Sequence, residues 1–263
     1  MTDLSPAPAI QAEWVSIAVP AVPGVAATAM AAWWARPAPG VPLRGAVLVL
    51  PEVFGVNGWV RGVAERLAAE GYAALAISTF ARTAPDLDVP YNEAGLAAGR
   101  QHRDQVTADQ LLADVAAAAA WLQQRHAAAL LGCVGFCFGG HLAMLAATLP
   151  VIAATCDFYG ARVSSDRPGA APGDSTQPPP TLAVVPQVPG RLWCFCGDQD
   201  PLMSPEEIAA IGEALSQAGG RHRLLIAAGA GHGYMCEARA DFHPEAARAG
   251  WSTMLELFAE TLG

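Results

Sequence analysis

The most constraining feature of this sequence is a cysteine framed by glycines, at residues 135–139. An apolar run at residues 129–134 leads into this frame, and a run with helical spacing at residues 140–149 leads out of it. This order predicts a strand, a sharp turn and a helix, with Cys137 raised at the turn. Side chains in place of the two framing glycines would crowd such a turn. A helix that begins at about Phe138 would direct its positive end at Cys137 and favour a thiolate there.

Strand-like and helix-like segments alternate along most of the chain. Besides the run before Cys137, the predicted strands are residues 14–19, 27–34, 45–50, 73–77, 151–158, 192–196 and 222–227. Besides the helix after Cys137, the predicted helices are residues 59–70, 104–126, 205–218 and 244–262. The first two strands can pair as an antiparallel edge. The alternation predicts an α/β fold with a mostly parallel central sheet of about eight strands and helices on both faces.

The length and composition favour one large α/β domain spanning residues 1–263. Hydrophobic residues make up 53% of the chain, which is enough for a sizeable core. One segment, residues 164–190, departs from the alternation because it is rich in proline, glycine, alanine and serine. We interpret it as a mobile surface insertion, and the alternative is a lid over the active site.

The charge pattern excludes several classes of partner and chemistry. The net charge of −9 argues against nucleic acid or an anionic membrane as the main partner. All 15 basic residues are arginine, so Schiff-base chemistry and lysine-dependent phosphate loops are excluded. The first 14 residues lack a secretory signal pattern, and no apolar run is long enough to span a membrane. We expect a cytoplasmic protein whose six cysteines are reduced.

Two later segments provide candidate partners for a cysteine nucleophile. Asp198 and Asp200 follow the predicted strand at residues 192–196, and His232 stands in a glycine-rich loop after the last predicted strand. A nucleophile needs a base, and the base needs an orienting carboxylate. Parallel strands end on the same side of a sheet, so these residues can converge with Cys137. We predict a catalytic set of Cys137, Asp200 and His232, with Asp198 better explained as a helix cap.

A fourth polar residue follows another buried strand. Glu52 stands directly after the predicted strand at residues 45–50, where a charge is costly without a partner. One interpretation is a structural ion pair with an arginine, and the other places the carboxylate beside Cys137. In the second case, the backbone N–H groups of Val53 and Phe138 become candidates for an oxyanion hole.

The remaining cysteines lack the glycine frame. Cys133, Cys156, Cys194 and Cys196 are better interpreted as buried packing residues. Cys194 and Cys196 form a Cys-x-Cys pair on a predicted strand, but no histidine ligands stand nearby, so we do not expect a metal site.

These segments together resemble the dienelactone hydrolase (carboxymethylenebutenolidase) family of α/β-hydrolases. The matching segments are residues 51–57, 135–140, 197–200 and 231–233, with a weaker match at residues 243–247. The resemblance implies a triad of Cys137, His232 and Asp200, with Glu52 contacting the resting thiol and the Val53 and Phe138 amides holding the oxyanion.

The resemblance also implies two substrate-binding residues, and it fails at one position. Arg82 matches the arginine that the family presents to a substrate carboxylate, and Tyr159 matches a tyrosine near the active site. Typical members carry a second carboxylate-binding arginine four residues after the catalytic histidine, where this chain has Cys236. Arg239 stands close by but out of register, so the nature of the substrate is left open.

The predicted function is therefore a carboxylic ester hydrolase that cleaves an enol-lactone or activated ester through a thioester on Cys137. A small-molecule lactone or ester is the expected partner, and no metal or organic cofactor is required. One alternative is a general carboxylesterase or thioesterase that acts on neutral substrates. An alternative from another class is a redox or ligand-sensing thiol protein that does not catalyse hydrolysis. We expect a monomer or a small homo-oligomer.

Overall fold

The computed structural model describes residues 9–126, 130–171, 174 and 176–262. Its strands are β1 (Ile10–Val19), β2 (Thr28–Pro37), β3 (Gly45–Leu50), β4 (Tyr72–Ile77), β5 (Leu131–Phe136), β6 (Ile152–Phe158), β7 (Arg191–Gly197) and β8 (Arg223–Ala227). Its helices are α1 (Gly58–Ala69), α2 (Glu93–Arg103), α3 (Ala108–Arg125), α4 (Phe138–Ala146), α5 (Pro205–Gln217) and α6 (Pro244–Leu262), with a 3-10 helix, η1, at Thr181–Gln187.

All eight strands form one sheet in the order β1-β2-β4-β3-β5-β6-β7-β8. β1 pairs with β2 and β2 with β4 in antiparallel register, and every later pairing is parallel. The predicted fold class, a mostly parallel sheet of eight strands with an antiparallel edge, is confirmed. The carboxyl ends of β3, β5 and β7 therefore point to the same edge of the sheet, which is where this architecture places functional residues.

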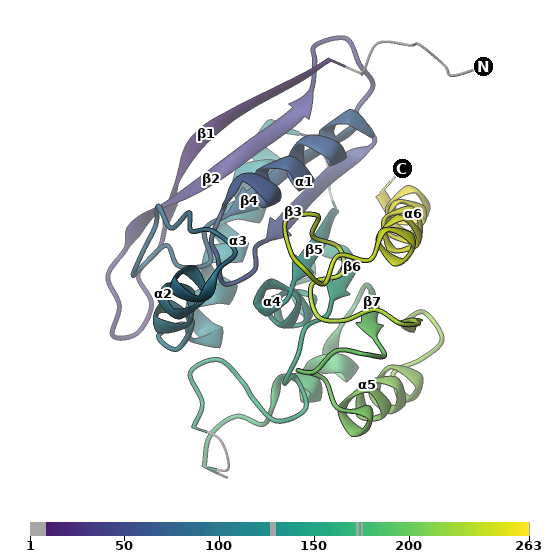
Figure 1. The fold of residues 1–263 in the computed structure, drawn as a ribbon. Coiled ribbons are helices and arrows are strands. Elements are labelled where there is room, and N and C mark those ends of the chain that lie inside the picture. Colours follow the sequence, from purple (N-terminus) through teal and green to yellow (C-terminus); the bar gives the residue numbers. More distant parts are fainter. Residues whose placement is uncertain (1–8, 127–129, 172–173, 175, 263) are drawn as a thin grey trace, which may run out of the picture.

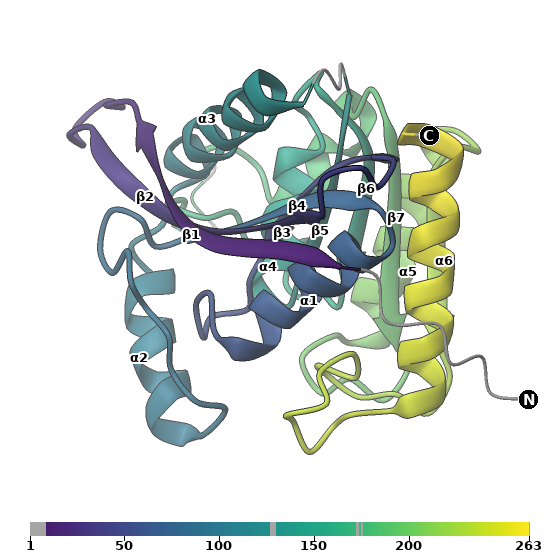
Figure 2. The same cartoon turned by 90° about the horizontal axis from the view of Figure 1, so that it is seen from above.

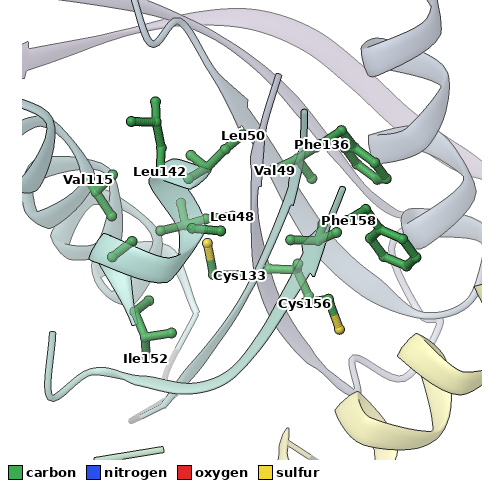
Figure 3. Packing of buried hydrophobic residues seen from close by; sticks show 14 of the residues in the cluster. Leu48, Val49, Leu50, Val115, Cys133, Phe136, Leu142, Ile152, Cys156 and Phe158 are labelled. Atoms are coloured by element: carbon green, nitrogen blue, oxygen red, sulfur yellow. The ribbon is translucent and has the colours of Figure 1, made fainter. Parts of the chain in front are cut away.

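Helices cover both faces of the sheet (Figures 1 and 2). α1 and α6 share one face, where the guanidinium of Arg66 lies over the ring of Trp251. α3 and α4 pack together on the other face. Figure 3 shows the resulting two-sided core: Leu48 lies on the side of α3 and α4, and Val49 points to the opposite side with Phe136. Continuous apolar strands are expected when both faces of a parallel sheet are buried.

The helices differ from the prediction in three places, one of which is α4, which ends at Ala146 and not at residue 149. α2 was not predicted, although Asn92 caps it by accepting a hydrogen bond from the backbone N–H of Gly95. α3 begins at Ala108 and not at residue 104, because Thr107 and Gln110 form a reciprocal capping box. Ala129, where the predicted fifth strand begins, lies outside the described residues. Across the described residues, no helix combines the length and apolar character needed to cross a membrane.

The insertion predicted at residues 164–190 is hydrogen-bonded to the rest of the fold at several of the residues that the structure describes. The carbonyl of Pro168 accepts a hydrogen bond from the N–H of Ala108 at the start of α3. The hydroxyl of Thr181 lies 2.7 Å from Nε2 of the buried His141 on α4. These hydrogen bonds join two points of the insertion to the helices beneath them.

Candidate active site

The glycine-framed cysteine forms a strained turn between β5 and α4. Cys137 has φ 54° and ψ −118°, a conformation that side-chain-bearing residues rarely adopt. A Cβ added at Gly135 would lie 1.9 Å from the carbonyl oxygen of Gly139, so the turn closes only with glycine there. Strain of this kind costs about 1–3 kcal/mol and persists where the surrounding structure enforces it. The turn exposes the Cys137 side chain in part, as a nucleophile requires.

Gly139 also brings the start of α4 against the end of β3. A Cβ on Gly139 would lie 2.2 Å from the carbonyl oxygen of Leu50 and 2.5 Å from that of Pro51. This close approach places Val53 and Phe138 along the same cleft as Cys137. Within the described residues, neither backbone N–H of this pair donates a hydrogen bond. Both are available for an oxygen that becomes negatively charged beside the sulfur.

His232 and Asp200 come together from the loops that follow β8 and β7. Nδ1 of His232 donates to Oδ2 of Asp200 over 2.8 Å, and both side chains are buried. The other carboxylate oxygen of Asp200 accepts the N–H of Leu202 at 2.8 Å. Asp198 is instead exposed and accepts the N–H of Gly229, so it holds the loop and does not orient the imidazole. With Nδ1 protonated toward Asp200, Nε2 is the atom of His232 left for the nucleophile.

Electrostatics couple the imidazole of His232 to the sulfur of Cys137. Burial opposes a charged imidazole, but the negative sulfur of Cys137 and the Asp200 carboxylate outweigh it and raise the pKa of His232 to about 10. Nε2 of His232 is buried, and within the described residues it makes no hydrogen bond with good distance and angle. Catalytic hydrogen bonds are often loose before substrate binds. The arrangement therefore favours a charged imidazolium at neutral pH.

Four of the predicted site residues line one cleft of about 390 Å³, namely Val53, Cys137, Phe138 and His232. Much of the remaining wall consists of the end of α2, residues 161–162 and the start of the insertion. None of these residues is among the predicted site residues. This wall contains the arginines Arg100, Arg103, Arg162 and Arg167, with the acids Asp104 and Asp166. A helix end and an irregular segment show no periodic pattern in the sequence. Only the charge of these residues could have indicated that they line the cleft.

Glu52 is fully buried, and its nearest partner is an arginine. Oε1 accepts a hydrogen bond from Nη1 of Arg239 at 2.8 Å, and Oε2 has no partner within the described residues. The structure therefore shows the ion pair with an arginine that the sequence left open as one interpretation, and no hydrogen bond joins Oε2 to the thiol within the described residues. Although burial opposes its charge, Glu52 and then Cys137 raise the pKa of Arg239. Arg239 therefore lies in the electrostatic field of both Glu52 and Cys137.

Arg82, which the resemblance implies binds substrate, does not line this cleft. Its side chain is 7% exposed, and Nη2 forms an ion pair of 2.6 Å with Asp114 on α3. The same guanidinium donates to the backbone carbonyls of Pro20 and Ala26, outside the cleft that Cys137 lines. Burial raises the pKa of Asp114 even though Arg82 opposes the shift. The Arg82 guanidinium thus links the β1–β2 connection to α3 through hydrogen bonds and an ion pair.

We expect Arg82→Ala to destabilise the protein by about 3 kcal/mol, because it leaves a buried carboxylate without its partner. Urea unfolding would measure this change. The double variant Arg82→Met/Asp114→Leu should recover most of the lost free energy of unfolding, because it removes both charges together. A stable Arg82→Ala protein with selectively weakened substrate binding would contradict this assignment.

Tyr159 lies beneath the site and outside the cleft. Its side chain is fully buried, and its ring packs edge-on against the His232 ring with centroids 5.3 Å apart. The hydroxyl has no partner within the described residues. The prediction that Tyr159 binds substrate is therefore not supported by its position. Its contact with His232 limits the movement of the imidazole.

The other cysteines do not form a second reactive centre. All six cysteines of the chain lie among the described residues and are free thiols. Burial raises the pKa of Cys133 to about 12 and that of Cys236 to about 11. Protonated thiols of this kind are poor nucleophiles and poor redox partners. In the described part of the chain, no three histidine, cysteine, aspartate or glutamate side chains gather as metal ligands.

Asp157 gives the fold a pH dependence of its own. It is buried in β6, where its Oδ1 accepts the N–H of Gly160, and burial raises its pKa to about 7. The folded protein then holds a proton that the unfolded chain releases near pH 4, so stability should fall as pH rises from about 4 to about 7. We expect Asp157→Asn to remove this decline in the free energy of unfolding. The decline amounts to as much as about 1.4 kcal/mol for each unit by which folding raises the pKa of Asp157. Urea unfolding at several pH values measures the slope, and an unchanged slope would contradict this assignment.

The dienelactone hydrolase family model matches residues 30–262 of this chain. A Synechocystis sp. protein named "Putative carboxymethylenebutenolidase" is 36% identical over 218 residues, covering 82% of this chain and 86% of that protein. A Bradyrhizobium sp. protein named "Probable 2-oxo-3-(5-oxofuran-2-ylidene)propanoate lactonase" is 32% identical over 251 residues, covering 94% of this chain and 93% of that protein.

A solved structure shares the architecture as well. The crystal structure titled "Putative Dienelactone Hydrolase" from Klebsiella pneumoniae superposes with a TM-score of 0.78 at 26% identity. The superposition covers 96% of this chain and 99% of that one. The similarity therefore extends over the sheet, the helices and the loops that carry the cleft.

Proposed function

We propose that this chain, a member of the dienelactone hydrolase family, cleaves enol-lactones and activated esters through a thioester on Cys137. The family match shows a hydrolase of lactone or ester bonds. The observation that supports this most strongly is the convergence of the Cys137 sulfur, the Asp200-bound imidazole of His232 and two free amides on one cleft. A nucleophile, an oriented base and oxyanion donors are the parts that acyl transfer requires.

The first half of the reaction acylates the enzyme. The Cys137 thiolate attacks the carbonyl carbon, and the negative charge moves to the carbonyl oxygen, which accepts hydrogen bonds from the Val53 and Phe138 amides. The carbon–oxygen bond to the leaving group then breaks. The leaving oxygen takes the proton from the His232 imidazolium, whose raised pKa keeps that proton available at neutral pH. A thioester and a neutral imidazole remain.

The second half releases the acid. Neutral His232, held by Asp200, takes a proton from a water molecule as that water attacks the thioester carbon. The same two amides stabilise the second oxyanion. The carbon–sulfur bond breaks, and the thiolate and the imidazolium are restored. Every proton and electron pair is accounted for by Cys137, His232, substrate and water.

The choice of sulfur favours substrates with good leaving groups. A thiolate is expelled from a tetrahedral intermediate more readily than an ordinary alkoxide, so simple alkyl esters return to reactants. An enolate or phenolate leaves more easily than an alkoxide and allows the thioester to form. Enol-lactones and aryl esters are therefore the expected substrates.

A hydrolysis panel tests this proposal. We expect measurable kcat/KM for a dienelactone and for an aryl ester, and a value at least about a hundredfold lower for the matching ethyl ester. Equal rates for aryl and ethyl esters would contradict the sulfur-based mechanism. A complete lack of hydrolysis across the panel would contradict the assignment as a hydrolase of these bonds.

A further inference from the structure

We infer that His141 is a positioning residue that ties residues 161–170 to the nucleophile helix α4, and that this tie sets the preference of the enzyme among acyl chains. The inference rests on the proposed hydrolysis at Cys137 and adds a determinant of substrate selection. Residues 161–162 and 166–170 line the same cleft as Cys137 and His141.

His141 is a buried polar side chain on an otherwise apolar helix. The other residues of α4 are glycine or apolar, and a buried imidazole is costly unless its nitrogens have partners. Nδ1 lies 3.0 Å from the carbonyl oxygen of Ala161, and Nε2 lies 2.7 Å from the hydroxyl oxygen of Thr181. A carbonyl only accepts, so Nδ1 carries the proton and Nε2 accepts the Thr181 hydroxyl. Burial lowers the pKa of His141 to about 4, which keeps the imidazole in this neutral form at neutral pH.

The two partners of His141 hold different parts of the cleft wall. The chain enters the wall pressed against α4, because a Cβ on Gly160 would lie 2.5 Å from the backbone nitrogen of His141. Thr181 is fully buried, and its N–H donates to the carbonyl of Asp166 at 2.9 Å. The N–H of Leu182 donates to the carbonyl of Val163 at 2.8 Å. His141 therefore fixes residues 161–166 to α4 both directly and through Thr181.

The same helix carries the nucleophile, one turn before His141. The N–H of His141 donates to the carbonyl of Cys137 at 3.1 Å. The tie therefore fixes the distance between the wall and the reacting sulfur, whereas the Asp200–His232 pair belongs to other loops. Ala161 and Pro168 give the wall apolar surface, against which the methylene groups of a long acyl chain can be buried. An acetyl group is too short to gain from that contact.

Two esters with the same leaving group test the inference. We expect wild-type kcat/KM to be higher for p-nitrophenyl hexanoate than for p-nitrophenyl acetate. His141→Phe removes both hydrogen bonds and should lower the hexanoate-to-acetate ratio about fivefold, with the loss in KM for hexanoate and not in kcat. Thr181→Val removes one hydrogen bond and should lower the ratio about threefold. His141→Asn should restore much of the ratio, because its amide nitrogen can donate to the Ala161 carbonyl in place of Nδ1.

His222 provides the matched control, because it is a second buried histidine with a ring hydrogen bond. Its Nδ1 accepts the N–H of Leu192 at 3.1 Å, and it is not among the residues described as lining the cleft. His222→Phe should lower the free energy of unfolding and leave the ratio unchanged. If His141→Phe does not fold, Thr181→Val carries the test, since valine keeps the shape of threonine. A folded Thr181→Val protein with the wild-type ratio and the wild-type KM for hexanoate would overturn the inference.

Hydrogen exchange measured by mass spectrometry separates this inference from the proposed function. Hydrolysis of neither ester by the wild-type protein would count against the proposed function, and exchange then tests the tie by itself. The N–H groups of Ser165 and Asp166 both donate to the carbonyl of Arg162 within the wall. Faster exchange of these amides in Thr181→Val than in wild type and His222→Phe would support the inference. Equal exchange in all three proteins would overturn it.

Discussion

Replacing Cys137 with alanine should lower kcat for an aryl ester by about 10⁴-fold or more, because the variant has no atom that can form the thioester. The change removes one sulfur and leaves the backbone of the turn as it was. Steady-state kinetics on purified protein measure the effect. Cys137→Ser should retain weak activity at best, because a hydroxyl gains far less than a thiol from a helix N-terminus and a neighbouring imidazolium.

Cys133 provides the matched control for this experiment. It stands four residues earlier in the chain and is buried on the side of α3 and α4 (Figure 3). Cys133→Ala should cost about 1 kcal/mol of stability through lost packing and leave the activity of the folded protein intact. Both variants should unfold cooperatively in urea. Turnover that survives Cys137→Ala in a folded protein would eliminate the proposed nucleophile.

A second large effect is expected at Gly139, where a single methyl group should disrupt both the fold and the catalysis. The added Cβ would lie 2.2 Å from the carbonyl oxygen of Leu50, and that backbone atom belongs to a central strand and cannot move aside. We expect Gly139→Ala to destabilise the protein by about 3 kcal/mol. We also expect kcat of the remaining folded protein to fall by about 10²-fold, because the Phe138 and Val53 amides move apart.

Gly62 on α1 is the control for Gly139, since an added Cβ there meets no atom within 4 Å. Gly62→Ala should stabilise the protein by as much as about 1 kcal/mol, as alanine does in a helix interior. Urea unfolding and aryl ester kinetics on the two variants provide the comparison. A Gly139→Ala protein with wild-type stability and kcat would contradict the role of the close approach between α4 and β3.

The parts of this molecule that depend on local pattern could be predicted from its sequence. The apolar run of β3 and the glycine frame around Cys137 indicated the strand and the turn, because burial and backbone geometry limit which residues can stand there. The convergence of Cys137, Asp200 and His232 followed from the direction of parallel strands. The structure places the Asp200–His232 pair as expected and leaves the catalytic roles to experiment.

The parts that depend on long-range pairing of charges could not be predicted. Arg82 was assigned to substrate by resemblance, but its partner Asp114 lies 32 positions away and on another element. Glu52 and Arg239 are separated by 187 positions, and only the folded chain shows that they pair. The arginines of the cleft wall come from a helix end and an irregular segment, where no periodicity indicates which side chains face inward.

The central claim, a covalent intermediate on Cys137, is tested most directly by mass spectrometry of the acylated protein. Wild-type protein mixed with excess aryl ester and quenched in acid should gain one acyl mass, located on the peptide that contains Cys137. His232→Asn should accumulate more of this species, because deacylation loses its base. Turnover with no acyl group on Cys137, or with the acyl group on another residue, would contradict the mechanism.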